Sequence, residues 1–166
     1  ALGMASHFEA AKGAYLIRDY RSDQPRQGCI FVQGTSTTAN IVKLLPELDK
    51  QGLNVKLVAA ISPQLFQLQD EAYRKSMITD ADRFDSTYIS NRSRRVTWDW
   101  SLNPLSNEYA LTSDFDDRWR TGGNLDEVIE EAHLSPEWLL QGIERFVKDR
   151  EKRLARMSDL VNAAKS

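Results

Sequence analysis

Features that are scarce in this sequence exclude several classes of protein. Cys29 is the only cysteine among the 166 residues, so no disulfide can form within the chain. No apolar run approaches the roughly 20 residues that a helix needs to cross a bilayer. The net charge of −2 combines both signs mixed along the chain, which creates no long-range field to attract nucleic acid or an anionic membrane surface. We therefore expect neither nucleic-acid nor membrane partners.

The first eleven residues, 1–11, mix small, polar and charged side chains and do not resemble a signal peptide. Together with the lone cysteine, this composition predicts the reducing cytoplasm as the compartment. The segment has no clear element of its own and opens on Ala1, so we expect it to be a linker remnant from a longer polypeptide.

Residues that carry catalysis are also few. Histidine occurs only at His7 and His133, which supplies too few ligands for a zinc site. A Ser–His–Asp arrangement needs a positioned base, and His133, at the end of a helical pattern, is typical of a capping or surface residue. Cys29 lies in an apolar run, where burial suppresses the thiolate. The sequence therefore predicts no catalytic residue and no metal site in this chain.

The composition, 41% hydrophobic and 28% charged, is that of one globular domain. Apolar runs predict strands at 14–17, 29–32, 55–61, 87–90 and 109–112. Helical spacing predicts a helix that follows Gly34 and ends at Gly52, and cap residues at Ser62, Asn124 and Ser135 predict three more. Beyond 148 the chain becomes strongly charged, and we expect 149–166 to form a solvated helical tail.

One loop combines the features of an anion site. It comprises Gly34, Thr35, Ser36, Thr37 and Thr38, between a predicted buried strand and a predicted helix. Free backbone N–H groups and the helix dipole favour an anion there, glycine permits close approach, and the hydroxyls can add hydrogen bonds. The alternative is simple capping of the helix by Ser36 or Thr37. The loop lacks the lysine of a P-loop.

Three other clusters have two interpretations each. Arg94, with Arg92 and Arg95, could help to hold a phosphate beside the Gly34 loop, or could form an exposed turn that pairs with Asp99 or Glu108. The acidic side chains of Asp114, Asp116 and Asp117 could bind a hard cation, or could belong to a solvated loop. The aromatic residues are interface anchors or core members; they are Trp98, Trp100, Phe115 and Trp119.

The segment from Phe66 to Ile78 resembles a signature of transketolase C-terminal domains. Its matching positions are Phe66, Gln69, Tyr73, Arg74, Ser76, Met77 and Ile78. Further similarities follow in the family's order: residues 12–15 at the entry to the first strand, Gly34-Thr35-Ser36, residues 51–55, and residues 134–138 at the start of the last helix. The family's Asp-x-Phe-Gly-x-Ser pattern is replaced here by residues 113–119. The resemblance covers 12–148.

The resemblance implies a three-layer α/β/α sandwich. Its mixed sheet has five strands in the order 1-3-2-4-5, with the first strand antiparallel. That order places the Gly34–Thr38 loop at a topological switch point.

The resemblance also implies a function that depends on other domains. Enzymes of this superfamily hold thiamine diphosphate and Mg²⁺ between an N-terminal and a central domain, through a motif that begins Gly-Asp-Gly, and this chain has no such motif. We therefore expect a non-catalytic domain that supports assembly, within a homodimer, of an enzyme for two-carbon ketol transfer between sugar phosphates.

Other interpretations remain. The parent could be a related 2-oxo-acid dehydrogenase first component or deoxyxylulose-phosphate synthase. The domain could instead be regulatory and bind a small anion or phosphometabolite at Gly34–Thr38. An independent enzyme on this kind of sheet would need a base and a nucleophile that the sequence does not offer.

Overall fold

The computed structural model describes residues 4–118, 120 and 122–165. Its strands are β1 Ala14–Arg18, β2 Cys29–Gln33, β3 Lys56–Ala60, β4 Ser86–Ser90 and β5 Leu111–Thr112. Its helices are α1 Thr35–Lys50, α2 Pro63–Gln67, α3 Glu71–Met77, α4 Asp80–Phe84, α5 Leu125–Glu131, α6 Pro136–Lys148 and α7 Arg150–Ala163. Short 3-10 turns lie at η1 His7–Lys12, η2 Arg94–Val96, η3 Trp98–Trp100 and η4 Ser106–Glu108.

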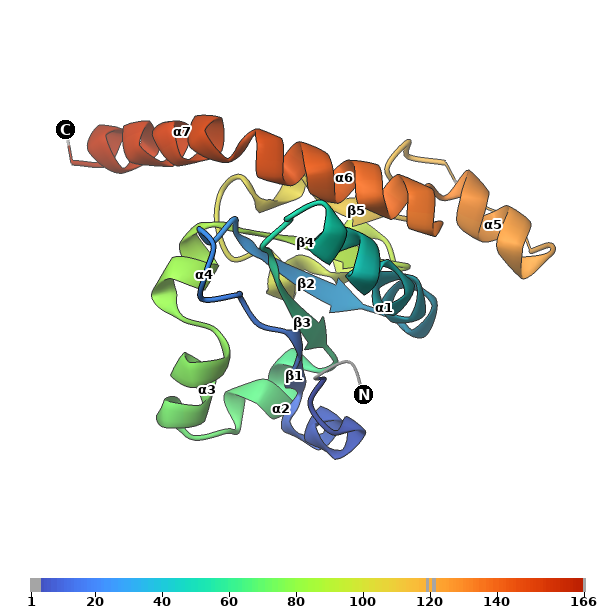
Figure 1. The fold of residues 1–166 in the computed structure, drawn as a ribbon, viewed down its shortest axis with the longest axis horizontal. Coiled ribbons are helices and arrows are strands. Elements are labelled where there is room, and N and C mark those ends of the chain that lie inside the picture. Colours follow the sequence, from blue (N-terminus) through green and yellow to red (C-terminus); the bar gives the residue numbers. More distant parts are fainter. Residues whose placement is uncertain (1–3, 119, 121, 166) are drawn as a thin grey trace.

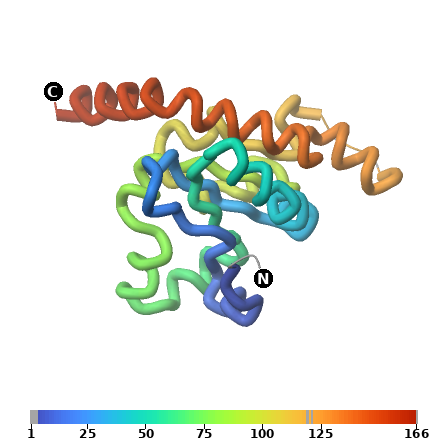
Figure 2. The backbone as a smooth tube through the Cα atoms, viewed as in Figure 1, coloured from blue at the N-terminus to red at the C-terminus, as the bar shows by residue number. Residues whose placement is uncertain are grey.

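The five strands form one mixed sheet in the order β1-β3-β2-β4-β5. Strand β1 runs antiparallel to β3, and the β2–β3, β2–β4 and β4–β5 pairs are parallel. The predicted order and the direction of the first strand are confirmed. Figures 1 and 2 show helices on both sides of the sheet, with α1 and α6 on one side and α2 and α3 toward the other.

Both faces of the sheet are buried, which explains why its strands read as continuous apolar runs. Successive side chains of a strand point to opposite faces. Thus Ile30 and Val32 pack with α1 and α6, whereas Cys29 and Phe31 pack with Phe66, Ile78 and Trp100 on the other face. These two apolar layers hold the sheet between the helices.

Most predicted element boundaries are confirmed, with local exceptions. Asn124 caps α5 by accepting a hydrogen bond from Asp126, and Gly52 ends α1 in a left-handed conformation with φ 68°. Ser135 holds the cap position of α6 but makes no capping hydrogen bond. The fifth strand is shorter than predicted because the chain up to Glu108 turns as η4, and Tyr109 packs its ring edge-on against Phe146 instead.

The charged segment after Lys148 is less solvated than its composition predicts. Helix α7 carries two buried residues, Arg153 and Met157. The Arg153 guanidinium donates to the buried carboxylate of Asp85 at 2.7 Å. Arg150 and Leu154 are half-buried, most other residues of α7 are exposed, and its C-terminal end lies beyond the sheet in Figure 1.

Candidate functional site

The Gly34–Thr38 loop lies where the topology of the sheet predicts a ligand crevice. Strand β2 ends at Gln33, and α1 begins at Thr35. From the centre of the sheet, the chain crosses to β3 on one side and then to β4 on the other. In open α/β sheets, ligands bind beyond the carboxyl ends of the strands at this kind of switch point. The predicted position of the loop is therefore confirmed.

Glycine is required at position 34. Its backbone has φ 100° and ψ 148°, a conformation that residues other than glycine rarely adopt. A Cβ there would also lie 2.2 Å from Oδ1 of Asn91. The missing side chain lets the loop after β4 approach the start of α1.

The hydroxyls of this loop do not cap the helix. Thr37 is fully buried and donates to the carbonyls of Gln33 and Gly34, and Thr38 donates to the Gly34 carbonyl at 2.7 Å. Ser36 accepts from Nδ2 of Asn91 at 3.3 Å. Because Gly34 is the N-cap and has no side chain to accept from the first turn, the interpretation of Ser36 or Thr37 as the cap is wrong. The first N–H groups of α1 have no side-chain cap.

An open cavity of about 580 Å³ lies against this uncapped end. The start of α1 contributes Gly34, Thr35 and Thr38 to its wall, Ile61 follows β3, and Asn91 and Arg92 follow β4. Among the described residues, the Arg92 side chain pairs with no carboxylate. Arg92 is therefore the basic residue that the fold brings to the Gly34 loop.

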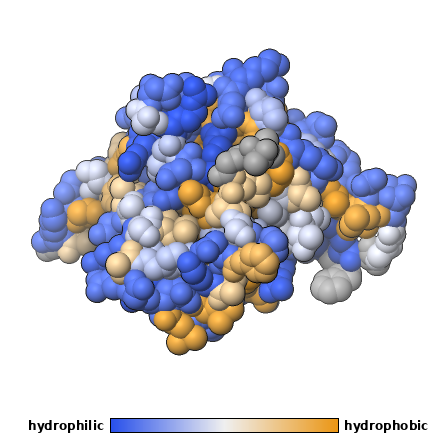
Figure 3. Space-filling model, turned by 60° about the horizontal axis from the view of Figure 1, so that its bottom comes forward, coloured by the Kyte–Doolittle hydropathy of each residue, from blue (hydrophilic) through white to orange (hydrophobic). Residues whose placement is uncertain are grey.

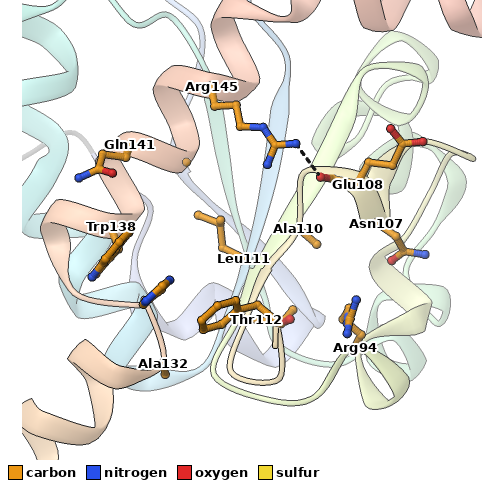
Figure 4. A pocket seen from close by; sticks show the side chains of 13 residues that line it. Arg94, Asn107, Glu108, Ala110, Leu111, Thr112, Ala132, Trp138, Gln141 and Arg145 are labelled. Atoms are coloured by element: carbon orange, nitrogen blue, oxygen red, sulfur yellow. Dashed lines mark hydrogen bonds between the residues drawn. The ribbon is translucent and has the colours of Figure 1, made fainter. Parts of the chain in front are cut away.

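Arg94 lies elsewhere, facing a second cavity of about 460 Å³ between β5 and α6. Figure 4 shows it across this cavity from Trp138 and Gln141. Its guanidinium is 2.8 Å from Asp117 and 3.7 Å from Asp114. The predicted pairing with Asp99 or Glu108 is therefore wrong, and Arg94 does not line the cavity at Gly34.

The acidic loop after β5 is neutralised by arginines. Asp116 lies 2.6 Å from Arg118 and 3.0 Å from Arg120. Although desolvation opposes the change, hydrogen bonds from these arginines lower the pKa of Asp116 to about 2. Within residues 4–118, 120 and 122–165, no three His, Cys, Asp or Glu side chains come together as a metal site would require.

The cysteine and histidine singled out by the sequence occupy structural positions. Burial raises the pKa of the Cys29 thiol well above its ordinary value, and its side chain is fully buried. His133 follows α5 in a left-handed conformation with φ 55°. Its ring is stacked between Phe115 at 4.2 Å and Trp138 at 3.7 Å, measured between centroids. Both residues therefore contribute to packing.

The predicted aromatic cluster is divided by the fold. Trp100 belongs to the core, and its ring lies tilted against that of Phe31, with 5.7 Å between ring centroids. Trp98 is 69% exposed, and Phe115 is partly exposed. Trp119 lies outside the described residues. Of the two described tryptophans in this cluster, Trp100 is therefore a core residue and Trp98 a surface residue.

Sequence reasoning missed a buried polar network at the amino-terminal end of β3. Lys56 donates to Asp82 at 2.9 Å, and the Tyr20 hydroxyl donates to the same carboxylate at 2.8 Å. Burial raises the pKa of Tyr20. A lysine within an otherwise apolar strand was the available signal, but its partner lies 26 residues away.

The described helices include none with the length and apolarity to span a membrane.

Comparison with known proteins gives a likeness of structure only. No family model matches the sequence, and no curated protein matches it. Among solved structures, transketolase from Campylobacter jejuni aligns over 87% of this chain, with a TM-score of 0.61 and 16% identity.

Two further transketolases align similarly. A Pichia stipitis transketolase solved with sedoheptulose 7-phosphate covers 92% of this chain at TM-score 0.64 and 18% identity, and one from Leishmania mexicana covers 89% at 0.62 and 16%. The chain spans only 20% of the length of each of the three. The resemblance to a transketolase C-terminal domain is thereby confirmed as a likeness of fold, and this chain has the fold of one domain of the transketolases.

Proposed function

We propose that this chain is the non-catalytic C-terminal domain of a transketolase-like enzyme, whose parent transfers two-carbon ketol units between sugar phosphates in the cytoplasm. The domain serves subunit assembly and structural support. One observation carries the proposal: 87–92% of the chain aligns with solved transketolases, yet it spans only a fifth of each of them. A segment of that size supplies one domain, and the remaining domains supply the reaction.

The residues of this chain do not fit the cofactor that such a reaction needs. Thiamine diphosphate is held through Mg²⁺, which takes oxygen ligands from carboxylates and carbonyls. The acidic side chains of the loop after β5 are engaged by Arg94, Arg118 and Arg120, and the sequence has no Gly-Asp-Gly. We therefore assign the cofactor and its metal to the missing N-terminal and central domains.

Exposed apolar side chains support a role in assembly. Phe8 and Leu68 are 77% and 79% exposed, and Leu65 on α2 is also exposed. Figure 3, which brings the underside of Figure 1 forward, shows apolar groups gathered among polar ones on that face. Exposed apolar patches of this kind commonly mark contacts with other proteins or domains. We infer that the thiamine-binding domains, within a homodimer, provide that contact.

The test combines this chain with the thiamine-diphosphate domains encoded in the same genome. The purified chain should fold cooperatively but transfer no ketol unit when thiamine diphosphate, Mg²⁺ and sugar phosphates are supplied. Co-expression with the thiamine-binding domains should give a stable complex by size-exclusion chromatography and restore turnover. Leu68→Asp should weaken that complex, whereas Lys75→Asp on exposed α3 serves as a charge-changing control.

Turnover by the chain alone would contradict the proposal. Failure of the chain to form a complex with any thiamine-binding domain encoded in the same genome would also contradict it.

A further inference from the structure

We propose that the cavity between β5 and α6 is a docking groove for an extended segment of a partner protein, which carries an aromatic residue and, two positions away, a glutamate. The aromatic side chain lies against Trp138 and Leu111, and the glutamate pairs with Arg145. This function is separate from the assembly role proposed above. Strands β1 and β5 are the two outer strands of the sheet, and η1 and α2, which carry apolar side chains assigned to assembly, contact β1.

The groove is large enough for a short peptide segment and offers it apolar contact. Its volume of about 460 Å³ is within the range of ligand pockets, about 300–1,000 Å³. Ala110 and Leu111 line it and are only half-buried by the rest of the chain. Gly142 lets α6 lie close to β5, since a Cβ there would be 2.4 Å from the Leu111 side chain. The strand and the helix therefore enclose the groove from two sides.

A stack of three rings forms one end of the groove. The His133 ring lies between those of Phe115 and Trp138, with centroid distances of 4.2 Å and 3.7 Å. Trp138 is also held by its Nε1, which donates to the Glu130 carboxylate at 2.8 Å. The rings are thus fixed in place by contacts within the chain. A fixed aromatic surface binds another ring with little loss of side-chain freedom.

Arg145 stands at the other end of the groove, and its guanidinium is already oriented. Its Cζ lies 5.0 Å from the centre of the Tyr109 ring, and it donates to the Glu108 carbonyl at 3.5 Å, the bond drawn in Figure 4. Within the described part of the chain, no carboxylate lies at ion-pair distance from Arg145. The Glu108 carboxylate is instead bound by Arg156 at 2.6 Å and 2.8 Å. An oriented guanidinium of this kind favours a carboxylate supplied by another molecule.

The spacing of the two ends indicates the spacing in the partner. Trp138 and Arg145 are seven positions apart on α6, which places them on one face of the helix, about 10 Å apart along its axis. In an extended chain, side chains two positions apart share a face and are separated by about 7 Å. The long side chains of glutamate and arginine cover the remaining distance. Adjacent side chains point to opposite faces, so only one of them would enter the groove.

The chain does not favour two other common ways of binding a peptide. Strand addition needs a row of backbone groups, and β5 provides only Leu111 and Thr112. Capture of a free C-terminal carboxylate typically uses clustered backbone N–H groups, whereas the unpaired donor in this groove is the side chain of Arg145. The other arginine of the wall, Arg94, is held by Asp117. Recognition therefore depends on the side chains of the partner.

The experiment measures binding of blocked pentapeptides to the purified chain by isothermal titration calorimetry. The probe is acetyl-Gly-Phe-Ser-Glu-Gly-amide, and a second probe carries Glu-Ser-Phe in the middle, because the two contacts do not fix the direction of the peptide. Three control peptides replace Glu by Gln, replace Phe by Ser, or place Phe and Glu side by side. We expect saturable binding of at least one probe, about threefold or more tighter than each control.

Matched variants of the chain test the role of Arg145. Arg145→Gln should weaken binding about threefold to fivefold and abolish the preference for Glu over Gln in the peptide. Gln141→Glu, at an exposed position of the groove wall, places a carboxylate one helical turn before Arg145. It should weaken binding similarly, because Arg145 then has a partner within the chain. Arg95→Gln removes the same charge from an exposed residue outside the wall and should leave binding unchanged.

Circular dichroism and melting temperatures establish that each variant is folded. Three results would overturn the proposal: no saturable binding of either probe, equal binding of the peptide in which Phe and Glu are adjacent, and equal losses in Arg145→Gln and Arg95→Gln. The last result would indicate nonspecific charge attraction. The peptides are titrated into the chain alone, so none of these results bears on assembly with the thiamine-binding domains, and the failure of either proposal is recognised separately.

Discussion

The contact between Arg153 and Asp85 should hold α7 against the rest of the domain. Arg153 is 4% exposed and Asp85 is 7% exposed, and the guanidinium lies 2.7 Å from the carboxylate. The same guanidinium donates to the Phe146 carbonyl and sits 3.6 Å from the centre of the Phe146 ring. Replacing Arg153 by Met keeps most of the apolar stem and removes the charge, the hydrogen bonds and the cation–π contact.

The structure indicates the size of the effect. Removing one partner from a buried ion pair typically costs about 3–5 kcal/mol, because the other charge remains buried without compensation. Here Asp85 retains Arg150, whose Nε lies 2.8 Å away with a side chain 29% exposed. That remaining partner places the expected loss near the lower limit, at about 3 kcal/mol. For a domain of this size each kcal/mol lowers the melting temperature by about 2–4 °C, so the total is about 6–12 °C.

Thermal and urea unfolding of the Arg153→Met variant and of the unsubstituted chain would measure this difference in stability. The control is Arg156→Gln in the same helix, which breaks an exposed pair with Glu108 that water and salt screen. The double variant Asp85→Asn with Arg153→Met should cost less than the sum of the single changes, because the two groups interact directly. An Arg153→Met protein no less stable than Arg156→Gln would refute the reasoning.

Two further predictions concern the loop and the acidic groups. Gly34→Ala should destabilise the domain by about 1–3 kcal/mol, because φ 100° is strained for alanine and its Cβ would collide with Asn91. The control is Gly52→Ala, which should cost less in urea unfolding, since φ is 68° there and no atom lies within 4 Å of the added Cβ. Equal losses in the two variants would contradict the steric argument. Desolvation opposes the lowered pKa of Asp82 and Asp116, but their hydrogen bonds lower it below 3.8, to about 2 for Asp116. The unfolded chain therefore binds protons first as pH falls, so the stability that these carboxylates contribute is complete above about pH 5 and is lost as pH falls toward 2. Unfolding curves from pH 5 to 2 should show this loss with a smaller slope for Asp116→Asn, and an unchanged slope would contradict the assignment.

The sheet could be predicted from the sequence because its signals are local. Buried strands such as Cys29–Gln33 are short apolar runs, and Gly52 and Asn124 mark helix ends by their backbone and capping preferences. The order of the strands came from the family resemblance, since local patterns do not state which strands are neighbours. The short β5 shows the limit: Tyr109 continues an apolar run but turns to pack on Phe146.

The candidate site was predicted only in part, because it is made by residues distant in the sequence. The position of the Gly34 loop followed from the strand and helix on either side of it. The choice between Arg92 and Arg94 depended on the turn after β4, which directs one toward Gly34 and the other toward Asp114. The pairing of Arg153 with Asp85 joins residues 68 positions apart, and nothing in a charged run marks one arginine as buried.

The short fifth strand has a consequence for the behaviour of the chain in solution. An outer strand exposes N–H and C=O groups that can recruit strands from other molecules, and long flat borders of this kind start fibrils. Only Leu111 and Thr112 form β5, so this outer strand is too short to pair stably with a strand from another molecule. The purified chain should therefore resist amyloid-type growth from that border even at the high concentrations needed for calorimetry.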